Sequence, residues 1–465
     1  MAVAKNKIEQ VMDYVQTQID SRIWTAQTRL PSVRQLAKQL GYSVSTVVEA
    51  YERLVAQGVI QAKAGSGFFV TAPNALLSMT SLAPKRERAV DPLWISRQTL
   101  EAGEAFLKPG CGWLPEDWLP QQSMRKAIRS SLSLPSKVLS DYATPQGAYA
   151  FRQLLAMRMQ SKQIDAIPEQ IMLMDSATQA IDLLCRFLLK PNDTVLVDDP
   201  CYFNFQALLK VHQVNVVGVP YTAQGVDIQA FEQAIHTHQP RLYITNAGLH
   251  NPTGAVQTLS NAYQVVKLIQ QANMLVIEDD IYADFEDEPA PRLAALDGLK
   301  NVIYIGSFSK TLSASLRCGF IASSMEWIDD LVDLKIATQF SHHYLSAEII
   351  YAILTDGSYR KHIDSMKLRL KRHMKSSIAQ LATLGITPWM VPKAGMFLWC
   401  QLDERYDVNQ LSKDCLAQDM VLAPGNSFSQ SQQFKNYLRF NVAQCQNPKV
   451  FQILAEALAL QNLNG

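Results

Sequence analysis

Lys310 lies in a segment whose composition suits a phosphorylated aldehyde. The stretch GSFSKTLSASLR, residues 306–317, holds four serines, a lysine and an arginine directly after the apolar run NVIYI. A lysine that forms a Schiff base needs its aldehyde partner held in place, and hydroxyl and guanidinium groups hold a phosphate well. Ser307 and Arg317 could therefore bind the phosphate of a cofactor whose aldehyde reacts with Lys310. A lysine beside serines also fits a solvated loop, so further partners are needed to distinguish the two.

Pyridoxal phosphate is such a cofactor, and its ring contacts have candidates in this chain. Asp279, in VIEDDIYADF, could keep the pyridine nitrogen protonated and so keep the ring an electron sink. Its neighbour Asp280 would point the other way at the end of a strand, so only one of the two is expected in the site. Tyr282 and Asn251, the latter in HNPTG, can both hydrogen-bond the ring oxygen. Taken singly, Asp279 also fits a helix cap and NPTG a plain turn.

A phosphate cradle and a platform for the ring complete the set. In DSATQAIDLLCRFLL, Ser176, Ala177 and Thr178 open an amphipathic helix, and the free N–H groups at a helix N-terminus bind phosphate. Tyr202, in DDPCYFNF, could stack on the ring, although a lone tyrosine is more often part of a core.

The elements that must position these residues alternate between helices and short apolar strands from about residue 92. Most of the strands are continuous apolar runs, which favours strands buried on both faces of a mostly parallel sheet. Several runs end in polar residues, and in open α/β sheets ligands bind at the carboxyl ends of strands. The clearest strands are TVLVDD, NVVGV, RLYITN, MLVIEDD, NVIYIGS and CGFIAS. The polar residues at their ends are Asp198, Asp199, Asn246, Asp279 and Ser307.

These residues, in this order and spacing, resemble the fold-type-I aminotransferases over most of residues 110–460, including PKAGMFLWC and YLRFNV. The resemblance implies an α/β domain with a smaller C-terminal subdomain. It also implies that Tyr142, in YATPQGAYAFR, reaches the phosphate of the partner subunit's cofactor, which would require a homodimer with its sites at the interface. By the same resemblance Arg439 binds the α-carboxylate of an amino acid, for which a bidentate arginine is suited. The alternative for Arg439 is a surface residue of a strand.

The first 70 residues have a different plan, which is that of an α+β winged helix-turn-helix domain. Three amphipathic helices are expected in KNKIEQVMDYVQTQIDS, LPSVRQLAKQLG and SVSTVVEAYERLVAQG, with Ser32 and Gln35 as a capping box for the second. VIQAKAGSGFFVTAP then predicts two strands around a Gly-Ser-Gly turn. In this plan the third helix lies in the DNA major groove. Residues 1–75 carry eight basic and five acidic side chains, a weak excess for binding phosphate.

The segment from LPSVRQLAKQLG to the wing resembles the GntR-type regulators nearly end to end. Members often carry a basic residue early in the third helix, where this chain has Val44 and Val48. Base readout would then depend on hydroxyl groups and on DNA shape. The alternative is a three-helix domain with no role in DNA binding. The resemblance implies that the DNA contacts are Arg34, Ser43, Ser45 and Thr46, with Lys63 and the turn Gly65–Gly67 as the wing.

The bulk composition limits the class of protein. The chain has 465 residues, a net charge of +1 and 48% hydrophobic residues, with no signal peptide, membrane span or C-x-x-C spacing. Its seven scattered cysteines favour reduced thiols in the cytoplasm and argue against zinc, so no metal is expected. We expect a DNA-binding domain over residues 1–72, a linker over 73–91 and an aminotransferase-like domain over 92–465.

A GntR-type winged helix joined to an aminotransferase-like domain resembles the MocR-type regulators over almost the whole chain. The resemblance implies a transcription factor that binds an operator and senses an amino compound, or the supply of pyridoxal phosphate, as a head-to-tail, domain-swapped homodimer. The alternative is a working aminotransferase with a DNA-binding appendage, because Lys310, Asp279, Tyr282, Asn251 and the two arginines are all present. A slow half-transamination is compatible with either. The effector, the operator and the direction of regulation are not encoded in these motifs.

Overall fold

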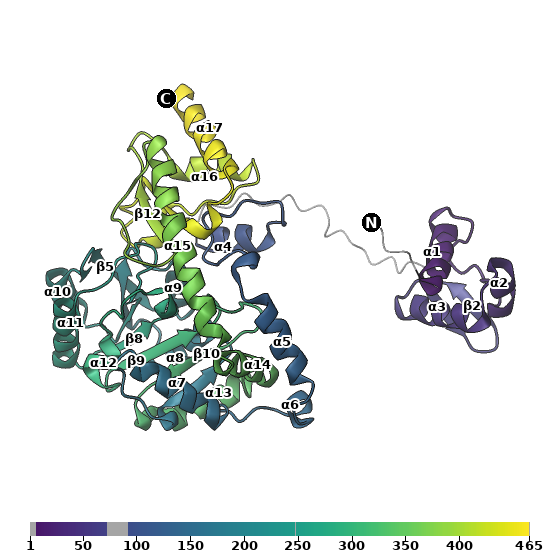
Figure 1. Ribbon diagram of the computed structural model, residues 1–465, viewed down its shortest axis with the longest axis horizontal. Helices are drawn as coiled ribbons and strands as arrows, with labels where there is room; N and C mark the ends of the chain where they lie inside the picture. The colour runs from purple at the N-terminus through teal and green to yellow at the C-terminus, as the bar shows by residue number, and fades with distance from the viewer. Residues whose placement is uncertain (1–5, 72–91, 247, 465) are drawn as a thin grey trace. The chain divides into compact units, whose positions relative to one another are not determined.

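The computed structural model describes residues 6–71, 92–246 and 248–464 (Figure 1). The chain divides into two compact units, one ending at Glu87 and the other beginning at Arg88. The linker expected over residues 73–91 lies outside the described residues. Each unit has a hydrophobic core of its own, so each is described by itself.

The smaller unit has the predicted winged helix-turn-helix plan. Both halves of the expected capping box are present, because the Gln35 N–H donates to Ser32 Oγ at 3.3 Å and the Ser32 N–H donates to Gln35 Oε1 at 3.0 Å. Val11, Val15 and Tyr51, among others, fill a core at helical spacing. Its elements are α1 (Lys7–Asp20), α2 (Val33–Leu40), α3 (Val44–Ala56) and the antiparallel strands β1 (Ile60–Lys63) and β2 (Gly67–Val70).

The larger unit is built on an eight-stranded sheet in the order β3-β10-β9-β8-β7-β4-β5-β6. Strands β9, β8, β7, β4 and β5 are parallel, whereas β10 pairs antiparallel with both β3 and β9. The predicted mostly parallel sheet is confirmed, and β3 and β6 are further strands in it that are not among those predicted from the sequence. The strands are β3 (Ile171–Met174), β4 (Thr194–Asp199), β5 (Asn215–Thr222), β6 (Gly225–Val226), β7 (Leu242–Thr245), β8 (Leu275–Asp279), β9 (Val302–Ser307) and β10 (Gly319–Ala322).

Helices pack on this sheet and lead to a smaller C-terminal subdomain. That subdomain holds a three-stranded antiparallel sheet of β11 (Thr387–Pro388), β12 (Phe397–Gln401) and β13 (Tyr437–Asn441). Figure 1 shows α15 as a long green helix that runs from the large sheet to the subdomain. The α-helices are α4 (Pro92–Glu101), α5 (Gln121–Ser131), α6 (Lys137–Ser140), α7 (Tyr149–Gln160), α8 (Ala177–Leu188), α9 (Phe203–Val211), α10 (Ile228–His238), α11 (Leu259–Ala272), α12 (Leu293–Asp297), α13 (Met325–Gln339), α14 (Tyr344–Thr355), α15 (Ser358–Thr383), α16 (Val408–Leu416) and α17 (Lys449–Asn464).

Short 3-10 turns connect several of these elements. They are η2 (Glu116–Trp118), η3 (Pro168–Gln170), η4 (Ala283–Phe285), η5 (Gly425–Phe428) and η6 (Val442–Gln444). None of the helices in the described ranges is long and apolar enough to span a bilayer.

The parallel strands bring their polar ends to one edge of the sheet. Strands β4, β7, β8 and β9 are neighbours in parallel pairs, so their carboxyl ends lie side by side. Asp199, Asp279 and Ser307 are the last residues of three of them, and Asn246 directly follows the fourth. This edge therefore carries the candidate site.

Candidate functional site

The carboxylate of Asp279 is buried, and one of its two oxygens accepts no hydrogen bond from the described residues. Asp279 ends β8 and is 2% exposed, and its Oδ1 has no hydrogen-bond partner in the described part of the chain. Burial raises the pKa of Asp279 to about 7. The Asn246 side chain donates to the backbone oxygen of Asp279 at 3.0 Å and fixes the end of the strand. A buried acceptor is costly unless a donor meets it, so Asp279 is placed to accept from a ligand N–H.

Asp280 takes part in a different network, as its position on a strand end predicts. Arg292 holds it with two hydrogen bonds, Nε to Oδ2 at 3.0 Å and Nη2 to Oδ1 at 2.9 Å. The Tyr304 hydroxyl donates to the same carboxylate at 2.6 Å. Asp280 is thus fully paired and structural, whereas Asp279 retains an oxygen for a ligand.

Lys310 lies half-buried in the loop after β9, close to Arg439. Burial, followed by the positive charge of Arg439, lowers the pKa of the Lys310 amine from 10.5 to about 8. A Cβ atom added at Gly112 would lie 3.8 Å from both Lys310 Nζ and Arg439 Nη2. Three segments far apart in the sequence therefore meet at this point. A lysine with a lowered pKa is a better nucleophile near neutral pH.

We expect this lowered pKa to be visible in the reaction of Lys310 with an aldehyde. The chain stripped of cofactor should take up pyridoxal phosphate at a rate that rises with pH and levels off above about 8, because only the neutral amine attacks. Stopped-flow absorbance across a pH series measures this. A rate that keeps rising toward the ordinary lysine value of 10.5 would contradict the assignment.

Arg439 is buried in the site rather than exposed on a surface strand. It lies on β13 and is 1% exposed, and its guanidinium carbon is 4.5 Å from the ring centroid of Phe397 and 4.8 Å from that of Phe428. Its Nη1 donates to Asn251 Oδ1 at 2.8 Å and its Nη2 donates to the oxygen of Gly110 at 2.7 Å. Its Nε has no acceptor among the described residues, and burial lowers its pKa. Both features suit a carboxylate ligand.

Asn251 connects Arg439 to Tyr282. While its Oδ1 accepts from Arg439, its Nδ2 donates to the Tyr282 hydroxyl at 3.3 Å. Tyr282 is buried three residues after Asp279, and burial raises the pKa of its hydroxyl. The amide of Asn251 and the hydroxyl of Tyr282 thus lie together, as a shared contact to a ring oxygen requires.

The start of α8 forms a tight cradle beside β10. Ser176 is the N-cap, and its Oγ accepts from the Gln179 N–H at 3.1 Å, which leaves the N–H groups of Ala177 and Thr178 for a ligand. A Cβ at Gly319 would lie 3.0 Å from the Ser176 carbonyl carbon and 3.1 Å from the Ala177 nitrogen. Only glycine therefore fits there, and its absence of a side chain lets the strand approach the helix N-terminus.

Ser307 lies at the same end of the sheet, and Arg317 is more exposed to solvent than Ser307. The Ser307 hydroxyl donates to the backbone oxygen of Cys318 at 3.0 Å, directly before β10. Thr178 is exposed in the first turn of α8. Arg317 is also exposed, with a left-handed φ of 46° and no ion-pair or hydrogen-bond partner within the described ranges. Its guanidinium is thus free for an anion.

Tyr202 lies close enough to Arg439 and Asp279 for their charges to affect the pKa of its hydroxyl. It precedes α9 and is half-buried against the rings of Phe203 and Phe205. Burial raises the pKa of its hydroxyl, while the charge of Arg439 lowers it and that of Asp279 raises it. Tyr202, which was predicted to stack on the cofactor ring, therefore lies next to the site residues Arg439 and Asp279.

Tyr142 is the predicted site residue that lies outside this cluster. Its side chain is 74% exposed and stacks on Phe340, with ring centroids 5.0 Å apart and an interplanar angle of 29°. Phe340 is itself 59% exposed. This pair projects an aromatic surface away from the core of its own chain.

The residues predicted to contact DNA lie on the surface of the smaller unit. Arg34 is exposed on α2. At the start of α3 the Ser43 hydroxyl lies 2.9 Å from Ser45 Oγ and 2.7 Å from Thr46 Oγ1, so it is hydrogen-bonded to both of the other hydroxyls. Exposed Val44 and Val48 lie on the same helix, and Val44 is 49% exposed.

The wing has the geometry of a tight turn with a cation beside it. Lys63 Nζ lies 4.7 Å from the ring centroid of Phe69 across the hairpin. Gly65 and Gly67 have φ values of 69° and 98°, which other residues adopt only with strain. The turn therefore depends on glycine.

Several residues of the site carried little signal in the sequence. Gly110 supplies an acceptor to Arg439, and Gly112 lets Lys310 and Arg439 converge. The rings of Phe397 and Phe428 pack against the guanidinium of Arg439. Asn246 was noted only as a polar strand end. The glycines of PGCG, residues 109–112, indicate that the backbone approaches another segment closely there. The sequence does not show which segment that is.

The donor set fits pyridoxal phosphate. An orphaned buried carboxylate oxygen suits the protonated ring nitrogen, a lysine of lowered pKa suits the aldehyde, and a helix N-terminus with a nearby hydroxyl suits the phosphate. No group of three or more metal-ligating side chains occurs in the described ranges.

Two families of known proteins match separate parts of the chain. Residues 116–458 match the family described as aminotransferase class I and II. Residues 7–70 match the bacterial regulatory proteins of the gntR family. The match to the first covers most of the larger unit and the match to the second covers the described part of the smaller one.

Curated relatives carry both parts. The chain is 26% identical over 430 residues to the uncharacterized HTH-type transcriptional regulator YisV of Bacillus subtilis (strain 168), covering 90% of this chain and 88% of the relative. It is 27% identical over 407 residues to the HTH-type transcriptional regulator NorG of Staphylococcus aureus (strain USA300), covering 85% and 91%.

Solved aminotransferases share the fold of the larger unit. LysN, the alpha-aminoadipate aminotransferase of Thermus thermophilus, complexed with N-(5'-phosphopyridoxyl)-L-leucine, aligns with a TM-score of 0.73 at 22% identity, covering 80% of this chain and 96% of its own. The kynurenine aminotransferase of Pyrococcus horikoshii aligns with a TM-score of 0.72 at 20% identity, covering 83% and 99%.

Proposed function

Because the chain belongs to the aminotransferase class I and II family and carries a regulatory domain of the gntR family, we propose that it is a DNA-binding transcriptional regulator that senses an amino compound through bound pyridoxal phosphate. The observation that carries the proposal is a complete cofactor and carboxylate site on the same chain as a winged helix. A metabolic enzyme does not need a DNA-binding domain. Relatives that match over both parts are named HTH-type transcriptional regulators.

The cofactor-binding residues divide by the part of pyridoxal phosphate that each would hold. When bound, the cofactor supplies an aldehyde that exchanges amines and a ring that withdraws electrons. Lys310 holds the aldehyde carbon, and Asp279 holds the ring nitrogen in its protonated form. Tyr282 and Asn251 contact the ring oxygen, and Tyr202 lies against the ring. The phosphate is bound by Ser176, Ala177, Thr178, Ser307 and Arg317.

The effector would be an amino acid or a related amine that carries a carboxylate. Its amine would compete with that of Lys310 for the cofactor aldehyde, and its carboxylate would bind Arg439. The buried guanidinium, with Nε lacking an acceptor among the described residues, supports a charged rather than a neutral partner. An amine and a carboxylate on one molecule together define the chemical class of the effector.

A homodimer is part of this proposal. The exposed Tyr142–Phe340 pair supports a role for Tyr142 at the phosphate of the partner subunit's cofactor, in a head-to-tail arrangement. Apolar side chains exposed nearby in the sequence on α5 and α6 support an interface. They are Ile128, Leu132 and Leu139, which are 47%, 80% and 63% exposed. The proposed regulatory role would require a cytoplasmic protein, because a regulator must reach its operator DNA.

For the DNA interface we expect a measurable electrostatic contribution from the wing. Binding should weaken steeply with salt, and Lys63→Ala should lower the slope of log affinity against log salt by about 0.9, the value for one lost phosphate contact. Arg34→Ala should behave similarly. Fluorescence anisotropy at several salt concentrations measures this, with Lys413→Ala in the other unit as control. A flat salt response would contradict phosphate-dominated docking.

A second function, an active aminotransferase, is favoured by one observation. Lys310, Asp279, Tyr282, Asn251 and Arg439 form a site from which no expected side chain is missing. A half-transamination is compatible with that geometry. Steady turnover between an amino acid and a keto acid, with no effect of either on DNA affinity, would favour the enzyme over the regulator.

The experiment that tests the regulator is a paired titration. Amino acids and amines are added to the cofactor-loaded protein while its visible absorption and its affinity for promoter DNA from its own gene neighbourhood are measured together. We expect at least one compound to change both at the same concentration, because a single binding event underlies both signals. If compounds that change the spectrum never change the DNA affinity, the sensor role is wrong.

A further inference from the structure

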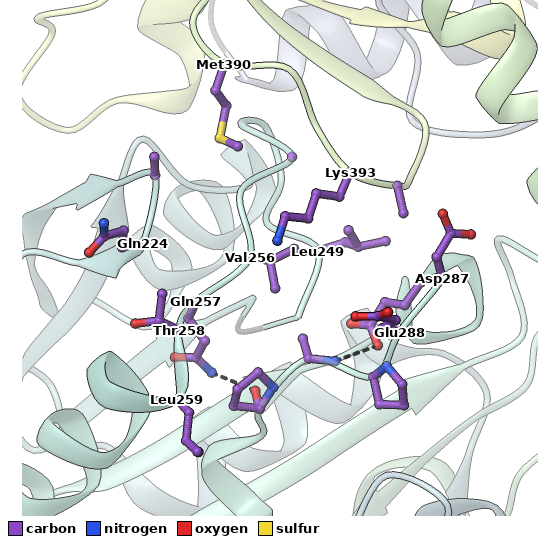
Figure 2. A pocket seen from close by; sticks show the side chains of 17 residues that line it. Gln224, Leu249, Val256, Gln257, Thr258, Leu259, Asp287, Glu288, Met390 and Lys393 are labelled. Atoms are coloured by element: carbon purple, nitrogen blue, oxygen red, sulfur yellow. Dashed lines mark hydrogen bonds between the residues drawn. The ribbon is translucent and has the colours of Figure 1, made fainter.

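A cavity of about 620 Å³ lies outside the cofactor site. It is bordered by the segment 249–259 after β7, by the loop 286–291 before α12, and by Met390, Lys393 and Ala394 between β11 and β12 (Figure 2). It therefore lies at the seam between the large sheet and the C-terminal subdomain. Ligand sites in proteins occur preferentially at such seams and have volumes in this range.

The walls of the cavity combine an apolar surface with charges of both signs. Leu249, Val256 and Met390 supply apolar contact area. Lys393 extends over the cavity with its amine toward Val256, and Asp287 and Glu288 border the cavity from another segment (Figure 2). Lys393, Asp287 and Glu288 are exposed, and none of them has a hydrogen-bond or ion-pair partner within the described ranges. A fourth charged lining residue, Glu286, is buried and is already paired with Arg292 at 2.8 Å. A positive and a negative group on separate walls suit a ligand with one charge of each sign.

The seam is in direct contact with the loop that carries Asn251. A Cβ at Gly254 would lie 2.6 Å from Pro392 Cγ, and one at Gly395 would lie 3.3 Å from Leu249 Cδ1. The segment with Lys393 thus packs against both flanks of Asn251, whose amide holds Arg439 and Tyr282. A shift of the subdomain at the seam would move these contacts, because the two segments pack closely at Gly254 and at Gly395 beside the cavity.

We infer that this cavity is a second ligand site, which binds an apolar amino acid or short peptide in its zwitterionic form. Lys393 binds the carboxylate and Asp287 with Glu288 binds the ammonium group, while the side chains lie on Leu249, Val256 and Met390. A ligand that bridges these groups clamps the C-terminal subdomain to the Asn251 loop. The regulator would then have a second input, separate from the cofactor and coupled to it.

The test uses the full-length, cofactor-loaded protein with leucyl-leucine and L-leucine as probes. Equilibrium dialysis measures the probe bound per chain, and the visible band of the cofactor separately reports events at Lys310. We expect binding that leaves the band in place, and at least about tenfold weaker binding in Lys393→Ala and in an Asp287→Asn, Glu288→Gln double variant, for loss of one charge-assisted contact. Lys435→Ala, a surface lysine of the same subdomain, should bind as the unaltered protein does.

Ligand analogues separate the two charges without altering the protein. N-acetyl-leucyl-leucine lacks the ammonium group and leucyl-leucinamide lacks the carboxylate, so each should bind more weakly and lose its sensitivity to the matching variant. The inference is overturned if neither probe binds without changing the cofactor band, or if Lys393→Ala binds as tightly as Lys435→Ala. Such a result would leave the DNA-binding role intact, because no DNA enters this measurement.

Discussion

Replacing Lys310 by alanine is expected to abolish retention of the cofactor. The amine at the end of Lys310 is the group that can hold an aldehyde covalently, and without it the phosphate and ring contacts act alone. We expect retention to weaken at least about 100-fold, equivalent to ~3 kcal/mol. The measurement is the visible absorption that remains with the protein after gel filtration.

Lys361→Ala supplies the control, because this lysine is exposed on α15. It should retain the cofactor fully. The thermal stability of the cofactor-free protein at pH 7 should not fall in Lys310→Ala. The pKa of Lys310 is lowered to about 8, so below that pH its charged form is disfavoured by burial and by Arg439, and removing the amine relieves that cost. Full retention of the absorption band in Lys310→Ala would exclude this lysine as the cofactor contact.

The second large effect is expected at Arg439. Arg439→Leu removes the only predicted carboxylate contact and should weaken amino acid binding by about 30- to 5,000-fold, the range for a lost partner of a buried charge pair. The shift of the cofactor band during titration with amino acids measures it. Amines without a carboxylate should act equally on the variant and on the unaltered protein, because they do not use the guanidinium.

That equality also distinguishes a lost contact from a misfolded protein. Arg405→Leu, at an exposed arginine of the C-terminal subdomain, is the matched control and should bind amino acids normally. If Arg439→Leu responds to amino acids as Arg405→Leu does, the carboxylate must be bound elsewhere.

The edge of the sheet that carries the site was predictable from strand ends alone. Asp279 and Ser307 terminate apolar runs, and parallel pairing brings such ends together. The choice of Asp279 over Asp280 followed from alternation along a strand. In the smaller unit the cap at Ser32 followed from local sequence, since an N-cap depends on neighbours three residues away.

Other features depend on contacts that no local pattern contains. Gly112 meets Lys310 and Arg439 across some 200 and 300 residues of chain, and the aromatic rings around Arg439 come from β12 and η5. The hydroxyls of Ser43, Ser45 and Thr46 were predicted as DNA contacts from their position, but their hydrogen bonds to one another follow only from rotamers. Residue types were readable from the sequence, whereas the bonds between them were not.

One such set of bonds would make the proposed amino acid site selective for a carboxylate. The two terminal nitrogens of Arg439 already donate to neutral oxygens of the chain, those of Asn251 and Gly110. A ligand that binds where these two oxygens lie competes with them, whereas Nε has no acceptor among the described residues and can bind without displacing one. Hydrogen bonds to a charged acceptor are about twice as strong as those to a neutral one, so a carboxylate prevails in this competition where an amide or an ester is at best equal. Asn251 also donates to Tyr282, so a ligand that displaced Asn251 from Arg439 would be expected to alter the proposed cofactor contacts as well.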